Sequence, residues 1–116
     1  MAAAKHNIIL GRGEDYVATL AIKTEDGQPV NITDDAFKGQ IRRGAGKPLI
    51  TSFVFTITDD VGGVVEIKLP LVNSLELDPN VTYQYDIFRY DDEEGDNIRL
   101  LSGSLIAEGN ITEPTT

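Results

Sequence analysis

The chain has 116 residues, a length that fits one domain, and a chain of this size buries roughly two-thirds of the surface that it exposes when unfolded. It contains no cysteine, which excludes disulfide bonds, Cys-ligated zinc and thiol nucleophiles. Ten Lys and Arg against 19 Asp and Glu give a formal charge of −9. Because phosphate groups repel an acidic surface, neither nucleic acid nor an anionic membrane is expected as a partner.

The N-terminal segment is poor in residues that could form a core. Its one apolar run, at residues 8–10, is far shorter than the ~18 residues of a membrane span, and it lacks the pattern of a signal peptide. We therefore expect a flexible arm over about residues 1–13, with no export or membrane signal. The lone His6 lies in this arm and is interpreted as a solvated residue, because a catalytic imidazole must be held in position.

Alternation of apolar and polar residues dominates the rest of the chain and predicts strands. The first alternating run spans residues 16–23, and its apolar face consists of Tyr16, Ala18, Leu20 and Ile22. A period of two is that of a half-buried strand. A turn at residues 25–29 and a short strand at residues 30–33 are predicted to follow.

Three further strands are predicted before this rhythm breaks. They span residues 37–43, 49–58 and 64–69, and turns rich in glycine or aspartate separate them. The residues predicted to point inward are Phe37, Ile41, Phe53, Phe55, Ile57, Val65, Ile67 and Leu69, and those predicted to point outward include Lys38, Gln40 and Arg42. Residues 70–80 then contain about one turn of helical spacing, between Leu71 and Leu75, which is too short to be a stable helix alone.

The last part of the chain predicts two strands joined by an acidic loop. Residues 81–90 and 98–107 are the strands, residues 91–97 are the loop, and residues 110–116 are a polar tail. The apolar side of the first strand consists of Val81, Tyr83, Tyr85 and Ile87. Seven or eight short strands, with no helix long enough to connect parallel ones, are typical of an antiparallel sandwich or barrel. We therefore predict a single all-β domain over residues 1–116.

The acidic residues offer few candidates for chemistry. The loop at residues 91–97 could supply oxygen ligands to calcium, although it lacks the alternation of an EF-hand, and a solvated hairpin tip is the other interpretation. The pairs Asp34–Asp35 and Asp59–Asp60 each flank a strand, where aspartate favours turns, so they are interpreted as turn residues and not as glycosidase carboxylates. No cofactor or metal site is expected.

Other short motifs are also interpreted structurally. Gly11-Arg-Gly13 and Gly44-Ala-Gly46 lack the ending and the strand-to-helix context of a phosphate loop. The Asn-x-Thr triplets at Asn31, Asn80 and Asn110 are interpreted as polar residues that border strands, since no export signal accompanies them.

The basic and aromatic residues leave one candidate contact. Arg42 and Arg43 are too few to form a basic patch, and Tyr83 and Tyr85 belong to an apolar face. Tyr90 lies on the opposite face beside the acidic loop and is a candidate contact residue. No catalytic set is found, and an enzyme is not expected.

One motif indicates the kind of sandwich. Leu77-Asp-Pro-Asn-Val-Thr-Tyr83, followed by Gln-Tyr-Asp-Ile87, resembles the approach to a late strand in fibronectin-like and immunoglobulin-like domains. This resemblance implies that the Tyr83 hydroxyl bonds to the backbone upstream, as in a tyrosine corner. It implies an immunoglobulin-like antiparallel β-sandwich of seven to eight strands.

A wider resemblance covers nearly the whole chain. Its pattern consists of Tyr16-x-Ala-Thr-Leu-x-Ile, Asp26-Gly-Gln-Pro-Val-Asn-Ile-Thr33, Phe37-x-Gly-Gln-Ile-Arg42, Gly63-x-Val-x-Ile-x-Leu-Pro70, Tyr85-Asp-Ile87, Arg99-Leu-Leu-x-Gly-x-Leu105 and Asn110-Ile-Thr112. In these runs the chain resembles small immunoglobulin-like virion proteins of tailed bacteriophages, including those similar to the N-terminal domain of baseplate upper proteins.

The resemblance implies a non-enzymatic structural protein of a bacteriophage virion, a tail or baseplate component or a fibre-attachment adaptor, assembled in the host cytoplasm. Its partners would be other virion proteins, in an oligomeric or symmetric arrangement. A capsid decoration protein is one alternative, because immunoglobulin-like domains serve there too. Another is a carbohydrate- or receptor-binding module that uses loops at one end of the sandwich, with Tyr90 as a contact.

Overall fold

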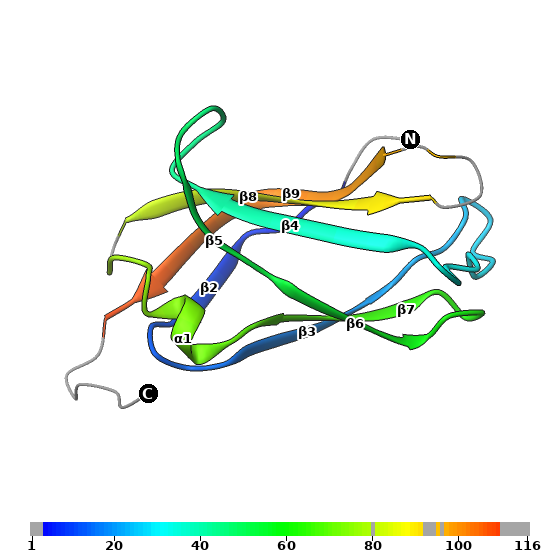
Figure 1. The fold of residues 1–116 in the computed structure, drawn as a ribbon, viewed down its shortest axis with the longest axis horizontal. Coiled ribbons are helices and arrows are strands. Elements are labelled where there is room, and N and C mark those ends of the chain that lie inside the picture. The colour runs from blue at the N-terminus through cyan, green and yellow to red at the C-terminus, as the bar shows by residue number, and fades with distance from the viewer. Residues whose placement is uncertain (1–3, 80, 92–94, 96, 110–116) are drawn as a thin grey trace.

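The structure, a computed structural model, describes residues 4–79, 81–91, 95 and 97–109. Its elements in chain order are β1 (Ala4–Lys5), β2 (Ile8–Gly11), β3 (Tyr16–Ala21), β4 (Ala36–Arg42), β5 (Leu49–Ser52), β6 (Val54–Asp59), β7 (Val64–Leu69), α1 (Leu71–Ser74), β8 (Thr82–Tyr90) and β9 (Asn97–Glu108). Two sheets pack face to face, and α1 lies at one end of the sandwich (Figure 1). The single helical turn predicted within residues 70–80 is therefore confirmed.

The strand order is that of an immunoglobulin-like sandwich. The larger sheet has the order β1-β9-β8-β4-β5, with β2 also paired to β9, and the smaller sheet has the order β3-β7-β6. These orders match the G-F-C and B-E-D groups of the immunoglobulin fold, with β5 in the position next to C. The all-β sandwich is thus confirmed. Its strands pair antiparallel, except that β1 and β2 run parallel to β9.

The N-terminal segment belongs to the larger sheet. Ile8 and Leu10 are each 5% exposed and contribute to the core, because β2 pairs with the end of β9. The chain passes close over Gly103, where a Cβ would lie 2.1 Å from the carbonyl oxygen of His6. The prediction of a flexible arm is therefore wrong for residues 4–13. The apolar run at residues 8–10 is too short to predict a strand by itself, and it is buried because it pairs with β9, a strand distant in sequence. Residues 1–3 and 110–116 lie outside the described residues.

The predicted strand at residues 49–58 is in fact two strands. β5 belongs to the larger sheet and β6 to the smaller one, and Phe53 lies at the crossing between them. The Phe53 N–H donates to the Gly39 carbonyl at 3.0 Å, and the side chain of Phe53 is buried. Alternation continues through the crossing, so the sequence pattern gives no sign that the partner strand changes.

The predicted strand at residues 30–33 is wrong. An isolated bridge joins Lys23 to Pro29 just before this segment, which then continues as a loop. The Val30 N–H donates to the Ile22 carbonyl at 3.0 Å and the Ile32 N–H to the Asp60 carbonyl at 2.8 Å, without forming a ladder. Proline has no N–H to donate to a ladder, which limits pairing at this point. Ile32 is nevertheless fully buried, so the apolar residue of this segment serves the core from a loop.

The predicted inward positions form most of the core. Among the positions predicted to point inward, those that are each no more than 4% exposed are Ile41, Val65, Ile67, Leu69, Tyr83, Tyr85 and Ile87. Gly39 faces the same side of β4, where a Cβ would lie 3.0 Å from the rings of Phe53 and Phe55, so glycine provides the space for both rings. Ile57 is 36% exposed, because β6 is at the edge of its sheet.

The tyrosine corner predicted at Tyr83 is confirmed. The Tyr83 side chain is 1% exposed, and its hydroxyl accepts a hydrogen bond from the N–H of Asp78 at 2.8 Å. This bond fixes the segment between α1 and β8 against the strand that follows it.

Substitution Tyr83→Phe is expected to lower the free energy of unfolding by about 1–3 kcal/mol, because it leaves the Asp78 N–H without its acceptor while keeping the ring. Urea unfolding measures this change. Tyr90→Phe is the control, since Tyr90 is 43% exposed and its hydroxyl is not part of the corner. A similar change in both variants would contradict a specific role for the Tyr83 hydroxyl.

Tyr85 connects the N-terminal segment to β8. Its hydroxyl donates to the carbonyl oxygen of His6 at 2.5 Å. Burial, and then the nearby Tyr16 phenol, raise the pKa of Tyr85 from 10.0 to about 12.

This pKa predicts a loss of stability in alkali. The unfolded chain releases the Tyr85 proton near its ordinary pKa of 10.0, whereas the folded chain keeps it until about 12, so the contribution is complete below pH 10.0 and is lost as the pH rises towards 12. The stability of the Tyr85→Phe variant should therefore decline less steeply than that of the parent protein as the pH rises. Urea midpoints of both proteins from about pH 8 to about pH 11 give the comparison, and parallel curves would contradict it.

Candidate functional site: the outer face of the larger sheet

The outward face of the larger sheet carries the polar side chains of β4 and β8 in register. Antiparallel pairing places Lys38 opposite Phe88, Gln40 opposite Asp86, and Arg42 opposite Gln84. Because successive side chains alternate across a strand, these six side chains share the face that points away from the core. The outward direction predicted for the three β4 residues is confirmed.

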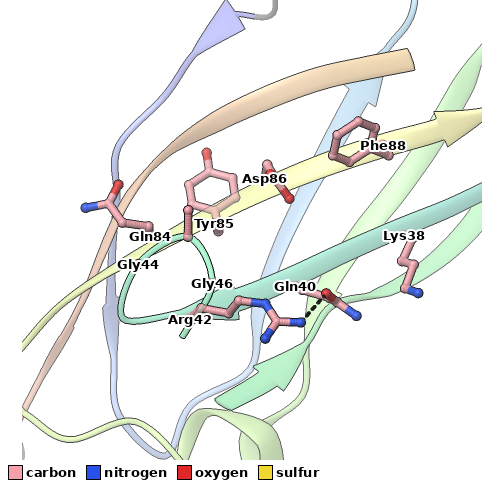
Figure 2. Close-up of a pocket in the computed structure, with 10 residues that line it drawn as sticks. Lys38, Gln40, Arg42, Gly44, Gly46, Gln84, Tyr85, Asp86 and Phe88 are labelled. Atoms are coloured by element: carbon pink, nitrogen blue, oxygen red, sulfur yellow. Dashed lines mark hydrogen bonds between the residues drawn. The ribbon is translucent and has the colours of Figure 1, made fainter. Parts of the chain in front are cut away.

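The turn between β4 and β5 makes a hollow of this face. Residues 43–48 project away from the sandwich (Figure 1). The Lys47 N–H donates to the Gly44 carbonyl at 3.1 Å, and Gly46 has a φ of 78°, which favours glycine. The hollow has a volume of about 440 Å³, and its lining includes the six side chains and the glycines of the turn (Figure 2).

Two charged side chains of the hollow, Arg42 and Asp86, have polar partners. Arg42 donates through one terminal nitrogen to the Lys47 carbonyl at 2.5 Å. Its other terminal nitrogen donates to Gln40 Oε1 at 3.0 Å (Figure 2). On the β9 side, the Arg99 guanidinium lies 5.3 Å from the centre of the Phe88 ring and 3.8 Å from Asp86 Oδ2. The guanidinium of Arg42 is therefore oriented before any ligand arrives.

A second, apolar hollow continues the first along the strands. It has a volume of about 610 Å³, and its lining includes Ala36, Lys38, Phe88, Tyr90 and Asn97. Lys38 and Phe88 line both hollows, so the two form one surface, which we call the outer-face groove. Tyr90, which the sequence indicates as a candidate contact residue, lies in this groove, on the face of the sheet.

The outer-face groove is cationic in an acidic protein. Within the described residues, neither Lys38 nor Arg42 forms an ion pair with a carboxylate. The carboxylate of the first hollow belongs to Asp86, which pairs with Arg99 at 3.8 Å. In a chain with 19 acidic and 10 basic residues, the groove therefore places two positive charges on one face of β4.

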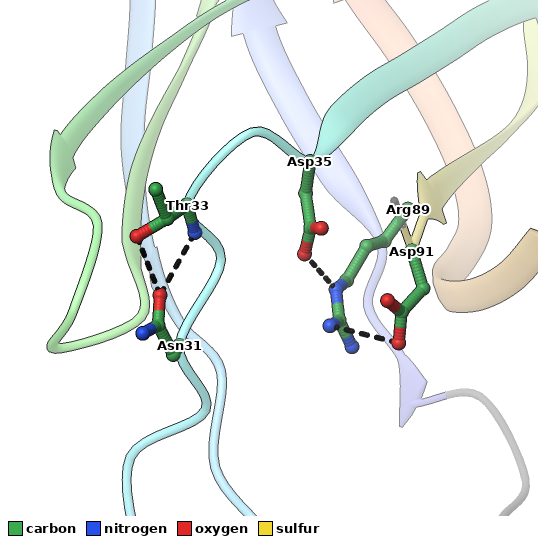
Figure 3. A network of polar contacts seen from close by, with 5 residues as sticks. All are labelled: Asn31, Thr33, Asp35, Arg89 and Asp91. Carbon is green, nitrogen blue, oxygen red and sulfur yellow. Dashed lines mark hydrogen bonds and ion pairs between the residues drawn. The ribbon is translucent and has the colours of Figure 1, made fainter. Parts of the chain in front are cut away.

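A buried ion network that the sequence analysis missed lies at one end of β8. Arg89 is 8% exposed and donates to Asp35 Oδ2 at 2.6 Å and to Asp91 Oδ2 at 3.3 Å (Figure 3). Asp35 is thus more than the turn residue that we predicted. A signal was present: Arg89 occupies the next inward position after Ile87, and a charge on an apolar face implies a buried counter-charge.

Arg42 and Arg43, adjacent in the sequence, are used in different places. Arg42 lines the groove, whereas Arg43 pairs with Asp78 at 3.0 Å and lies 5.6 Å from the centre of the Tyr83 ring. The prediction that they do not make a basic patch by themselves is consistent with this divergence.

The remaining turn motifs have structural roles. Asp59 Oδ1 accepts the Gly62 N–H at 2.9 Å, and Asp60 Oδ1 accepts the Val61 N–H at 2.8 Å, so this pair makes turns as predicted. Asn31 Oδ1 accepts both the N–H and the hydroxyl of Thr33, at 2.9 and 2.6 Å (Figure 3).

The Gly11–Gly13 segment fastens the chain to α1 and the turn after it. Arg12 donates to the Leu77 carbonyl at 3.0 Å, and the Gly13 N–H donates to Ser74 Oγ at 2.9 Å.

The His6 side chain is exposed, although its backbone is hydrogen-bonded to Ser102 and Tyr85. Most of the acidic loop lies outside the described residues, and so do the triplet asparagines Asn80 and Asn110. The part of the chain that is described contains no group of three or more acidic or histidine residues able to hold a metal.

The fold and the groove define an immunoglobulin-like β-sandwich with a hollowed sheet face. No protein-family model matches the chain, and no curated protein matches it either. Within the described residues, no helix has the length and apolar character needed to cross a membrane.

Substitution Arg89→Met is expected to lower the free energy of unfolding by about 3–5 kcal/mol, because it removes the guanidinium that balances a carboxylate whose side chain is 4% exposed. The double variant Arg89→Met/Asp35→Leu should recover part of the loss, since it removes the more buried carboxylate together with the guanidinium and leaves Asp91, whose side chain is 17% exposed. Urea unfolding of the single and double variants measures the coupling. A double variant that loses the sum of the two single effects would contradict the pairing.

Proposed function

We propose that the chain is a non-enzymatic structural protein of a bacteriophage virion, a tail or baseplate component or a fibre-attachment adaptor. Two observations support this: the resemblance of its sequence to small immunoglobulin-like virion proteins, and the open edges of its smaller sheet. The open edges are independent of the resemblance and are the structural support for the proposal.

Both edges of the smaller sheet offer backbone groups to a neighbour. Within the described residues, no strand pairs with the outer edge of β3 or of β6. Each of these strands has six residues, and neither residues 16–21 nor residues 54–58 include a charge or a proline. Soluble proteins protect exposed edges with charges, prolines, bulges or short strands, because an open edge pairs with other chains.

The larger sheet is protected in the expected way. Its outer strands are short, with two residues in β1 and four each in β2 and β5. In the smaller sheet, the one bulge lies at the end of β6, between Ile57 and Asp59, and the rest of that strand is regular. This contrast supports an assembly role in which strands of neighbouring proteins add to β3 or β6.

The position in the particle is tested by cryo-electron microscopy of the phage particles that are produced together with the chain. Density in the tail or baseplate, in contact with fibres, would support the proposed role. Density on the capsid lattice would establish capsid decoration, the alternative, in its place. Particles that lack the chain altogether would contradict both.

Substitution Thr56→Lys is expected to reduce incorporation of the chain into particles by about tenfold or more, because it places a charge in the middle of the β6 edge. Thr56 is exposed, so the isolated domain should unfold at the same urea concentration as the parent. Thr19→Lys tests the β3 edge in the same way.

The matched control is Thr82→Lys, which adds the same charge to an exposed position of the larger sheet, opposite Ile106 of β9 and outside both open edges of the smaller sheet. Quantitative mass spectrometry of purified particles measures copy number. Full incorporation of both edge variants would show that the open edges are not the contacts.

A further inference from the structure

We propose that the outer-face groove binds an acidic oligosaccharide, a sugar chain that carries carboxylates. The site goes beyond an assembly role, since it uses the face of the larger sheet and not the edges of the smaller one. Its elements are two cations that have no carboxylate partner among the described residues, a set of amide and carboxylate side chains, and an exposed aromatic ring.

The cations favour a ligand of sparse negative charge. Among the described residues, Lys38 and Arg42 have no carboxylate partner, and they stand at two positions of β4 separated by Gln40. At ~3.3 Å for each residue of a strand, their side chains leave the backbone about 13 Å apart. Two charges at this spacing suit a chain with an occasional carboxylate. A phosphate backbone has a far higher charge density and would be repelled by a protein of charge −9.

The neutral groups of the groove fit sugar hydroxyls. Gln40 and Gln84 present amides that can both donate and accept, and Asp86 presents acceptors. Arg42 uses its hydrogen bonds to Lys47 and Gln40 to hold its guanidinium in one orientation, and it has further N–H groups for a ligand. A preorganised donor lowers the entropy that binding would otherwise cost.

Tyr90 supplies the apolar part of the site. Its side chain is 43% exposed and lines the second hollow, beside Phe88 and Ala36. A sugar ring has an apolar C–H face that packs against an aromatic ring, while its hydroxyls bind polar side chains at the rim. The two hollows share Lys38 and Phe88 in their linings, so a ligand that occupies both would be an extended one.

An acidic peptide fits this surface less well. β8 pairs with β4 and with β9, whereas the other edge of β4 pairs with β5 only at residues 40–42. A peptide seated in the groove would lie over the faces of β4 and β8 and not along that edge, so it could not extend the sheet through backbone hydrogen bonds. Recognition at this face depends on side chains alone, and the amides of Gln40 and Gln84 match hydroxyl groups more closely than peptide carboxylates.

The test begins with the purified full chain on an array of uronate- and sialate-containing oligosaccharides and their neutral counterparts. We expect binding to acidic members and at least about tenfold weaker binding to the neutral ones. Binding to neutral members only, or to no member, would overturn the proposal. Equal binding to poly-glutamate would also overturn it, since the groove would then be merely cationic.

Isothermal titration with the strongest acidic oligosaccharide then assigns the site. Arg42→Gln and Lys38→Gln should each weaken binding by about tenfold, and Tyr90→Ala by about five- to tenfold. Lys68→Gln removes the same charge from the smaller sheet and is the matched control. Urea unfolding confirms that each variant is folded. An equal loss in Lys68→Gln, or unchanged affinity in the groove variants, would overturn the assignment.

Discussion

The antiparallel register between β4 and β8 is the constraint on which the rest of the structure depends. In this register Phe37 and Ile41 join Tyr83, Tyr85 and Ile87 on one face of the sheet, and the polar row of the groove takes the other. A slip of one residue would exchange the two faces, since the side-chain period of a strand is two. The core and the candidate binding site are therefore two consequences of one pairing.

Two different interactions fix β8 at its two ends. At its start, the Tyr83 hydroxyl accepts the N–H of Asp78, and at its finish Arg89 pairs with Asp35, which precedes β4. A buried ion pair contributes little net stability compared with apolar residues of similar volume, because two charges must lose their hydration. We infer that its value here is in specifying the register, since a shifted strand would leave the guanidinium among apolar side chains.

The two sheets offer neighbours different kinds of surface. The smaller sheet has six-residue edge strands with no charge before Asp59 at the end of β6, and such edges suit the addition of a strand from another protein. The larger sheet has short outer strands but a hollowed face over β4 and β8, and the lining of this face includes Lys38 and Arg42. The proposed assembly role and the proposed glycan site therefore use separate parts of the domain, and one can be altered without the other.

The sequence by itself determined the class of fold, most inward positions and the tyrosine corner, because a strand's alternation and a corner motif are local patterns. It did not determine which strands pair. Only the tertiary structure decided that Ile8 and Leu10 are buried beside β9, that Phe53 lies where the chain changes sheets, and that Arg89 meets Asp35. The same holds for the groove: residues 38–42 and 84–90 are far apart in the chain, and the period of each strand says nothing of its partner. Their juxtaposition depends on long-range pairing, which no local pattern encodes.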